Sequence, residues 1–154
     1  MPVFQPGKGK KGLEHQEYAE KAKEYLLRIG KIDRLVGRMR RLVSELRMEM
    51  NGIRMRAEGE RVKASPQQDR IGETVAKILD LEQQITAQTN RLIDQKQEAL
   101  GLIAQLNDPD QQNVLLARYF QFYQWRKIAL EMHYCEAAVY KIHTRALTEL
   151  GKKL

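Results

Sequence analysis

Three side chains near the end of the chain, His133, Cys135 and His143, could bind a metal ion or take part in covalent chemistry. A zinc site needs several Cys, His or carboxylate ligands at a spacing that brings them together, and these three share no such spacing. Cys135 would act as a nucleophile only beside a base and an orienting group, and the sequence places neither next to it. We therefore expect no metal site, no cofactor and no covalent catalysis.

Two other patterns that can mark catalytic sites are incomplete. The glycine-lysine run at residues 7–12 lacks the four-residue gap, the following Ser or Thr and the preceding strand of a phosphate-binding loop. The carboxylates are scattered over several predicted helix faces, with no pair placed for general acid and base catalysis. The sequence accordingly predicts no enzyme activity.

The charge balance favours an anionic partner. The 154 residues include 27 Lys and Arg against 20 Asp and Glu, a formal net charge of +7, and such a field attracts nucleic acid at long range. No run of about 18 apolar residues is present, so we expect no membrane span. The N-terminal residues have no apolar signal core, and the single cysteine cannot form an internal disulfide. Both features favour a cytoplasmic location.

Residues 107–154 have the outline of a helix-turn-helix domain. Asp108 and Pro109 form a helix restart signal, in which Asp108 caps the helix and Pro109 takes its first position. Three helices are predicted, over about 109–120, 124–132 and 136–150, and residues 121–123 and 133–135 connect them. A short second helix, a three-residue turn and a longer third helix are typical of domains that place the third helix in the major groove of DNA.

The apolar residues of the last two predicted helices indicate which side chains point outward. The inward-facing set is Ile128, Ala129, Met132, Val139, Ile142, Ala146 and Leu150. The candidate DNA-binding residues are those left outside, together with the start of the preceding helix: Gln124, Arg126, Glu136, Ala137, Tyr140, Lys141, Thr144 and Arg145.

Each kind of side chain in this set suits a particular contact. Lys141 is the best candidate for guanine acceptors, Glu136 could accept from cytosine, and Tyr140 could reach a phosphate or a thymine methyl group. Gln124 and Arg126 are expected to touch phosphates and set the register. A nearby aromatic group could stack on bases, but at helical spacing in a small domain we predict that it belongs to the core. Its members are Tyr119, Phe120, Phe122, Tyr123 and Trp125.

Residues 13–106 are predicted to form a long antiparallel hairpin of two helices with coiled-coil-like packing. In the first helix, over about 14–58, apolar residues repeat every seven positions in two rows. The rows are Ala22, Ile29, Val36, Val43, Met50, Ala57 and Tyr18, Tyr25, Ile32, Met39, Leu46, Ile53. The second helix, over about 66–106, has an apolar row, Ile71, Ile78, Ile85, Leu92, Ala99, Leu106, and a more polar one, Val75, Glu82, Thr89, Lys96, Ile103.

Local signals place the ends of these two helices. Gly59 is a plausible stop for the first, and Ser65, Pro66 and Gln68 make a capping-box start for the second. Before the first helix, residues 1–12 hold two prolines, three glycines and three lysines. We predict a flexible basic tail there.

A hairpin of this length buries little apolar surface per residue, and either dimerisation or a third helix packed on it would cover the rest. We expect a homo-oligomer formed through the hairpin. The role of one row of arginines in the first helix is open. The row recurs every seven residues and consists of Arg40, Arg47, Arg54 and Arg61. The row could be a ridge that faces phosphates or a partner. It could equally be a solvated face whose charges set the pairing of the two helices.

The stretch 127–150 resembles region four of bacterial primary sigma factors without a gap. The matching features are Ile128-Ala129, the turn, Val139 and Ile142, and the run Arg145-Ala146-Leu147 with Leu150. From Ala22 onward the chain resembles a phage-encoded family whose tail is like sigma region four and which is related to phage late-transcription regulators. The segments that carry this resemblance are AKEYLLRIGKIDRLV, ERVKASPQQDR, VAKILDLEQQI, NRLIDQKQE and LNDPDQQNVLLARY. The resemblance implies phage or prophage origin and a bacterial host cell.

The chain departs from the sigma pattern in three ways. His133 stands where the turn has Gly, and it would have to adopt a left-handed conformation at some cost. Cys135 replaces the usual Ser or Thr cap of the third helix. Glu136 and Ala137 replace outward-facing residues that are normally Arg and Glu, so any DNA sequence that is read should differ from a promoter −35 element.

Three function classes remain open from the sequence. The first is a transcription regulator that binds double-stranded DNA and contacts bacterial RNA polymerase. The second is a phage DNA-packaging adaptor, similar to a small terminase, in which the coiled coil builds a ring. The third is a structural protein-interaction module that binds no DNA, which the small excess of charge in residues 107–154 (7 basic, 5 acidic) keeps open.

Overall fold

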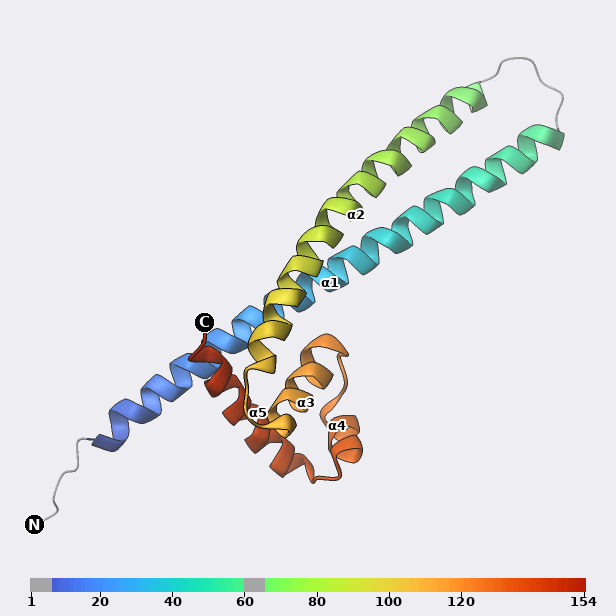
Figure 1. Ribbon diagram of the computed structural model, residues 1–154. Helices are drawn as coiled ribbons and strands as arrows, with labels where there is room; N and C mark the ends of the chain where they lie inside the picture. The colour runs from blue at the N-terminus through green and yellow to red at the C-terminus, as the bar shows by residue number, and fades with distance from the viewer. Residues whose placement is uncertain (1–6, 60–65) are drawn as a thin grey trace, which may run out of the picture. The chain divides into compact units, whose positions relative to one another are not determined.

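The computed structural model describes the backbone of residues 7–59 and 66–154, and the side-chain surroundings of residues 10–56 and 69–154 (Figure 1). Two long helices, α1 (Gly7–Gly59) and α2 (Pro66–Ala104), come first. They are followed by α3 (Pro109–Leu115), a π-helical segment η1 (Leu116–Phe120), α4 (Trp125–Met132) and α5 (Glu136–Gly151). No strand occurs within the described residues. The prediction of an all-α protein is therefore confirmed.

The contacts group the chain into two compact units, and each is described by itself. One, the helical-pair unit, consists of residues 31–94. The other, the terminal unit, combines the residues up to Gly30 with residues 95–154. The domain boundaries predicted from the sequence, at residues 12 and 106, stay predictions.

In the helical-pair unit, α1 and α2 run side by side in opposite directions (Figure 1). Arg40 Nη2 donates to Thr89 Oγ1 at 3.4 Å, and Arg47 pairs with Glu82. Seven steps forward along α1 correspond to seven steps back along α2, which fixes the antiparallel register. Thr89 and Glu82, two polar residues of the second predicted row on α2, are thus explained by their contacts with arginines of α1.

The buried row of this unit follows the predicted heptads. Val36 and Val43 of α1 and Ile78 and Leu92 of α2 are all less than a tenth exposed. The companion rows are half-buried, as expected for positions at the edge of a two-helix seam. Of the arginine row, Arg40 and Arg47 serve pairing between the helices, and Arg61 lies outside the described residues.

The start of α1 differs from the prediction. Residues 7–12, assigned from the sequence to a flexible tail, are helical, because α1 begins at Gly7 rather than near Glu14. Once the following turns have formed, each added residue gains a hydrogen bond without a new nucleation cost, and lysine is a good helix former. The first six residues of the predicted tail lie outside the described part of the chain.

The other predicted helix boundaries agree closely with the structure. The second helix begins at Pro66 as predicted, while the capping role of Ser65 falls on a residue that is not described. Asp108 caps α3 as predicted, with Oδ1 accepting a hydrogen bond from the Asp110 backbone N–H at 2.9 Å. The predicted helix over 109–120 is α-helical only to Leu115 and then widens into η1.

The terminal unit holds α3, η1, α4 and α5 around a small core. Its centre consists of Val114, Ala117, Ile128, Ala129 and Val139. At the end of α5, Gly151 approaches the backbone of α1 so closely that a Cβ atom there would overlap the Tyr18 carbonyl. Lys21 Nζ donates to the Leu154 carbonyl at 3.1 Å. These contacts attach the C-terminus to the first turns of α1.

The connection between η1 and α4 has an unusual backbone. Phe122 has a φ of 58°, a left-handed conformation that bulky residues rarely adopt. The turn is held by the Tyr123 N–H donating to the Ala117 carbonyl at 2.9 Å and by Arg118 Nη1 donating to the Tyr123 carbonyl at 3.0 Å. The Phe122 ring packs over Gly30, with a ring carbon 3.3 Å from where a Cβ would stand.

Candidate nucleic-acid interface

The three-residue turn between α4 and α5 has a defined geometry that starts from His133. This residue ends α4 with φ 58° and ψ 36°, in the left-handed region, as the sequence predicts for the position where related turns have Gly. The next residue, Tyr134, donates its backbone N–H back to the Ala129 carbonyl at 3.1 Å. Such a bond closes the last turn of a helix in the way of a Schellman motif. The direction of the chain after α4 is thereby set.

The start of α5 is held by packing and backbone bonds. Cys135 occupies the N-cap position, and its side chain makes no capping hydrogen bond, which agrees with its poor capping chemistry. The Cys135 carbonyl accepts from the Val139 N–H at 3.1 Å. Val139 is fully buried against Ile128 and Ala129 of α4, so the crossing of the two helices is fixed by close contact of small and branched side chains.

The inward-facing set predicted from the sequence is buried or half-buried. Ile128, Ala129, Val139, Ala146 and Leu150 are buried, whereas Met132 and Ile142 are half-buried. Leu147 is also buried, although it was not in the predicted inward-facing set. The helix α5 contacts α3 as well as α4, so more than one of its faces is covered.

Every candidate DNA-binding residue is exposed. The exposed set is Gln124, Arg126, Glu136, Ala137, Tyr140, Lys141, Thr144 and Arg145. Six of them lie along α5, and Tyr140, Lys141, Thr144 and Arg145 line one shallow depression of about 310 Å³. Gln124 is the N-cap residue of α4. The structure thus brings the α5 members together into one row, which is called the α5 row below.

An aromatic cluster supports the middle of the α5 row. The Trp125 ring lies between Tyr140, at a centroid distance of 4.8 Å, and His143, at 4.6 Å. The Arg118 guanidinium stands over the same indole at 4.5 Å. Trp125 is half-buried and packs against the core, and it supports one side of the Tyr140 ring while 44% of that residue stays exposed. Phe122, also predicted to belong to the core, is 40% exposed.

His143 lies beneath the α5 row and faces inward. Its Nε2 is 2.8 Å from the Tyr119 hydroxyl. Burial, together with the cationic Lys23 and Arg118, lowers the pKa of His143 to about 4. Burial also raises the pKa of Tyr119 to about 12. The neutral imidazole can accept a hydrogen bond from the Tyr119 hydroxyl, so an uncharged hydrogen bond links η1 to α5.

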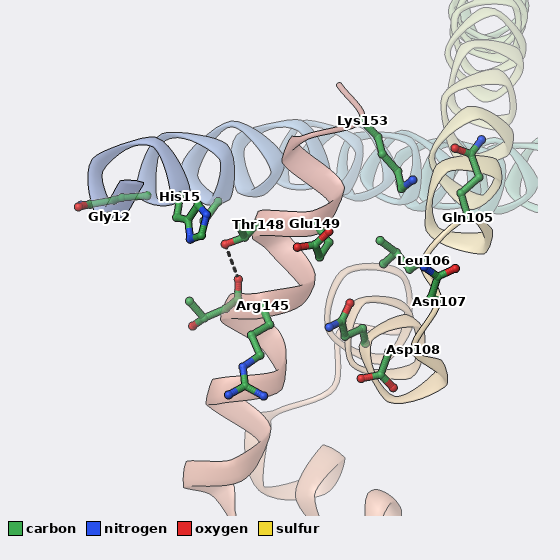
Figure 2. Close-up of a pocket in the computed structure, with 14 residues that line it drawn as sticks. Gly12, His15, Gln105, Leu106, Asn107, Asp108, Arg145, Thr148, Glu149 and Lys153 are labelled. Carbon is green, nitrogen blue, oxygen red and sulfur yellow. Dashed lines mark hydrogen bonds between the residues drawn. The ribbon is translucent and has the colours of Figure 1, made fainter. Parts of the chain in front are cut away.

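A polar cleft adjoins the C-terminal end of the row (Figure 2). It has a volume of about 760 Å³ and lies between the first turns of α1, the α2–α3 connection and α5. Among its lining residues are Arg145 and Lys153, which have no carboxylate partner in the described part of the chain, and His15. The two lining carboxylates are engaged: Asp108 caps α3, and Glu149 pairs with Lys152 at 2.9 Å. The cleft therefore offers cationic side chains beside the α5 row.

Sequence reasoning did not find the cleft or the Tyr119–His143 pair. The one available signal for His143 was its position four residues after Val139, on the buried face of the same helix. Nothing local connects His15 or Lys153 with Arg145, because α1 and α5 meet only through the tertiary fold.

The described residues hold no group of three or more His, Cys, Asp or Glu side chains arranged to bind a metal ion, and Cys135 is exposed. None of the described helices is long and apolar enough to span a membrane.

Comparison with known proteins gives a family assignment. No curated protein and no solved structure matches the chain. A family match spans residues 59–151, which include α2, α3, η1, α4 and α5 and make up more than half of the sequence. The chain belongs to the family described as "Protein of unknown function (DUF1492)".

Proposed function

We propose that the protein is a sequence-specific DNA-binding regulator of transcription. In this proposal α4 and α5 form a helix-turn-helix that follows a long antiparallel helical hairpin, and α5 enters the major groove of double-stranded DNA. The observation that carries the proposal is the α5 row, in which six exposed side chains of mixed hydrogen-bonding character lie together on one helix face.

The rigidity of the support favours base recognition. A recognition helix must hold its side chains in a fixed position relative to the base edges. Here the left-handed His133, the buried Val139 and the Trp125 ring against Tyr140 fix α5 at its start, its inner face and its outer edge. A helix whose outer face only contacts solvent would not need a ring such as that of Trp125 to hold an exposed side chain such as Tyr140 in place.

The chemistry of the row suits the edges of base pairs. Lys141 can donate to guanine O6 and N7, and Glu136 can accept from the cytosine amino group. The Thr144 hydroxyl donates to the Tyr140 carbonyl at 3.0 Å, which leaves its lone pairs and its methyl group for a base. Ala137 leaves room for close approach at the start of the helix.

Phosphate contacts have candidates on both sides of the row. Gln124 and Arg126 are exposed at the start of α4, where helix-turn-helix domains usually touch the backbone. On the other side, Arg145 and Lys153 line the cleft without a carboxylate partner among the described residues. Unpaired cations beside a reading helix can neutralise phosphates and release counterions.

The resemblance to sigma region four extends the proposal to a biological setting. We infer a phage or prophage protein that acts in the cytoplasm of a bacterial host and contacts RNA polymerase at the promoters it regulates. The changed outward residues Glu136 and Ala137 imply a binding site unlike the −35 element. The protein needs no cofactor and performs no catalysis in this role.

Selection of bound fragments from random-sequence double-stranded DNA tests the proposal. We expect one short sequence to be enriched by the parent protein and by Lys77→Ala, since Lys77 is exposed on α2 and is not part of the row. We expect Lys141→Ala to lose or change that sequence. Enrichment of no sequence by the parent protein would reject sequence-specific binding.

A further inference from the structure

A second apolar row lies on the surface of α2 in the helical-pair unit. Leu79 is 54% exposed and Ile93 is 47% exposed. Each follows directly after a residue of the buried row, Ile78 or Leu92, and Thr86 stands midway between them. The spacing of seven keeps the three side chains in line along the helix.

This row lies on the same side of the helical pair as the Arg40–Thr89 and Arg47–Glu82 contacts, a side called the pairing face below. On each helix, positions one and four after a buried residue turn to the same side, because one residue is about 100° of rotation. Thr89 stands four after Ile85, and Arg40 stands four after Val36. The corresponding row on α1 consists of Gly37, Ser44 and Asn51, which follow Val36, Val43 and Met50. Gly37 and Ser44 have little side-chain bulk.

The opposite side of the helical pair has another composition. There the exposed apolar residues are Leu35 and Leu42 of α1, at 46% and 45% exposure. The matching positions on α2 are Lys77, Gln84 and Arg91, so an apolar row faces polar and cationic ones. The two faces are therefore unequal, and only the pairing face combines an apolar row with small neighbours.

The register of the unit decides what could cover the pairing face. Arg40 stands beside Thr89 and Arg47 beside Glu82, so Ile93 lies at the level of Val36 and Thr86 at the level of Val43. Ile93 is thus level with Gly37 to within one residue, about 1.5 Å, and Thr86 is level with Ser44 in the same way. Consider a second copy related to the first by a two-fold axis parallel to the helices. The apolar row on α2 of each copy would then lie against the Gly37 and Ser44 row on α1 of the other.

The charges favour the same arrangement. Residues 31–56 of α1 hold eight basic and three acidic side chains, and residues 69–94 of α2 hold three basic and five acidic ones. When α1 of one copy lies over α2 of another, a basic helix faces an acidic helix along the whole contact. The alternative, with α1 over α1, would bring two basic helices together.

We propose that the pairing face binds a second copy of this chain, with α1 of each copy over α2 of the other and a two-fold axis parallel to the helices. Ile93 and Thr86 of one copy then lie over Gly37 and Ser44 of its partner, and Leu79 lies over Asn51. This inference concerns residues 31–94 only and does not depend on DNA binding. A dimer of this kind is isologous, because the same patch is used twice.

Light scattering and sedimentation of the whole protein provide the first test. We expect a mass of twice 18.0 kDa for the parent protein and a shift toward the monomer for Ile93→Lys. Leu42→Lys is the matched control, since Leu42 is equally exposed but lies on the opposite side. A monomeric parent protein would overturn the proposal, and so would equal behaviour of the two variants.

Cross-linking of single-cysteine variants tests the orientation. In a Cys135→Ser background, a mixture of Ser44→Cys and Thr86→Cys proteins should form a mixed disulfide under mild oxidation. Each variant alone should form far less, because equal positions do not meet in this arrangement. Efficient coupling of Ser44→Cys with itself would show α1 over α1 and contradict the proposal, whatever the protein does with DNA.

Discussion

The Tyr119 hydroxyl and His143 Nε2 lie 2.8 Å apart, so a bond between η1 and α5 closes a loop of 24 positions directly beneath the α5 row. The two rings are also nearly parallel, with centroids 5.8 Å apart. Because burial favours the neutral form of both side chains, the contact is an uncharged hydrogen bond in a half-buried site. Its strength should depend on the protonation of His143.

Acid should weaken the terminal unit through His143. The pKa of this residue is lowered to about 4 in the folded protein, mainly by burial, from an ordinary value of about 6.5. Between these values the unfolded chain binds a proton that the folded protein does not, so the free energy of unfolding should decrease as pH falls from about 6.5 to about 4. Below that window His143 should cause no further loss.

Urea unfolding at a series of pH values, at one protein concentration, measures this effect. His143→Gln should be less stable at pH 7 but should show a shallower decrease between pH 6.5 and 4 than the parent protein. His15→Gln is the control, since His15 is exposed, and it should keep the parent slope. Identical slopes for the parent protein and His143→Gln would mean that His143 is not buried in its neutral form.

The seam of the helical-pair unit should depend on its buried row. Ile78 is 6% exposed, and Ile78→Asp would place an unpaired charge there, at a cost of about 3 kcal/mol or more. Ile85→Asp should cost less, because Ile85 is only half-buried. Ala87→Asp is the matched control and should be nearly neutral, because Ala87, two residues after Ile85, is exposed. Equal melting temperatures for Ile78→Asp and Ala87→Asp would exclude Ile78 from a packed seam.

The turn before α5 should become more stable when His133 is replaced by glycine. A left-handed conformation costs an ordinary residue roughly 1 kcal/mol, and glycine adopts it without steric strain. We expect His133→Gly to raise the free energy of unfolding by about 0.5–1 kcal/mol and His133→Val to lower it. Chemical denaturation separates the two. A glycine variant no more stable than the valine variant would contradict the left-handed geometry.

Local patterns in the sequence predicted much of the fold. Asp108 and Pro109 specify the start of α3 through their own chemistry, and Pro66 does the same for α2. The heptad rows predicted Val36, Val43, Ile78 and Leu92 as buried because helical periodicity is a local property. In the same way, the apolar face of α5 predicted which of its residues are exposed.

Features that depend on distant contacts could not be predicted. The widening of the helix at 116–120 and the positive φ of Phe122 arise where η1 turns toward α4 and the ring meets Gly30. The cleft beside Arg145 exists because α1 and α5 pack through Tyr18 and Gly151. No periodicity in one helix reports the partner that another helix provides.

The most direct test of DNA reading by α5 compares Lys141→Ala with Arg126→Ala on the selected sequence and on random DNA. Lys141→Ala should lose about 1–3 kcal/mol on the selected sequence and much less on random DNA. Arg126→Ala should weaken both about equally and reduce the salt slope by about one. If neither substitution changes the affinity for the selected sequence, α4 and α5 are not the DNA-reading elements, and the proposed function is wrong.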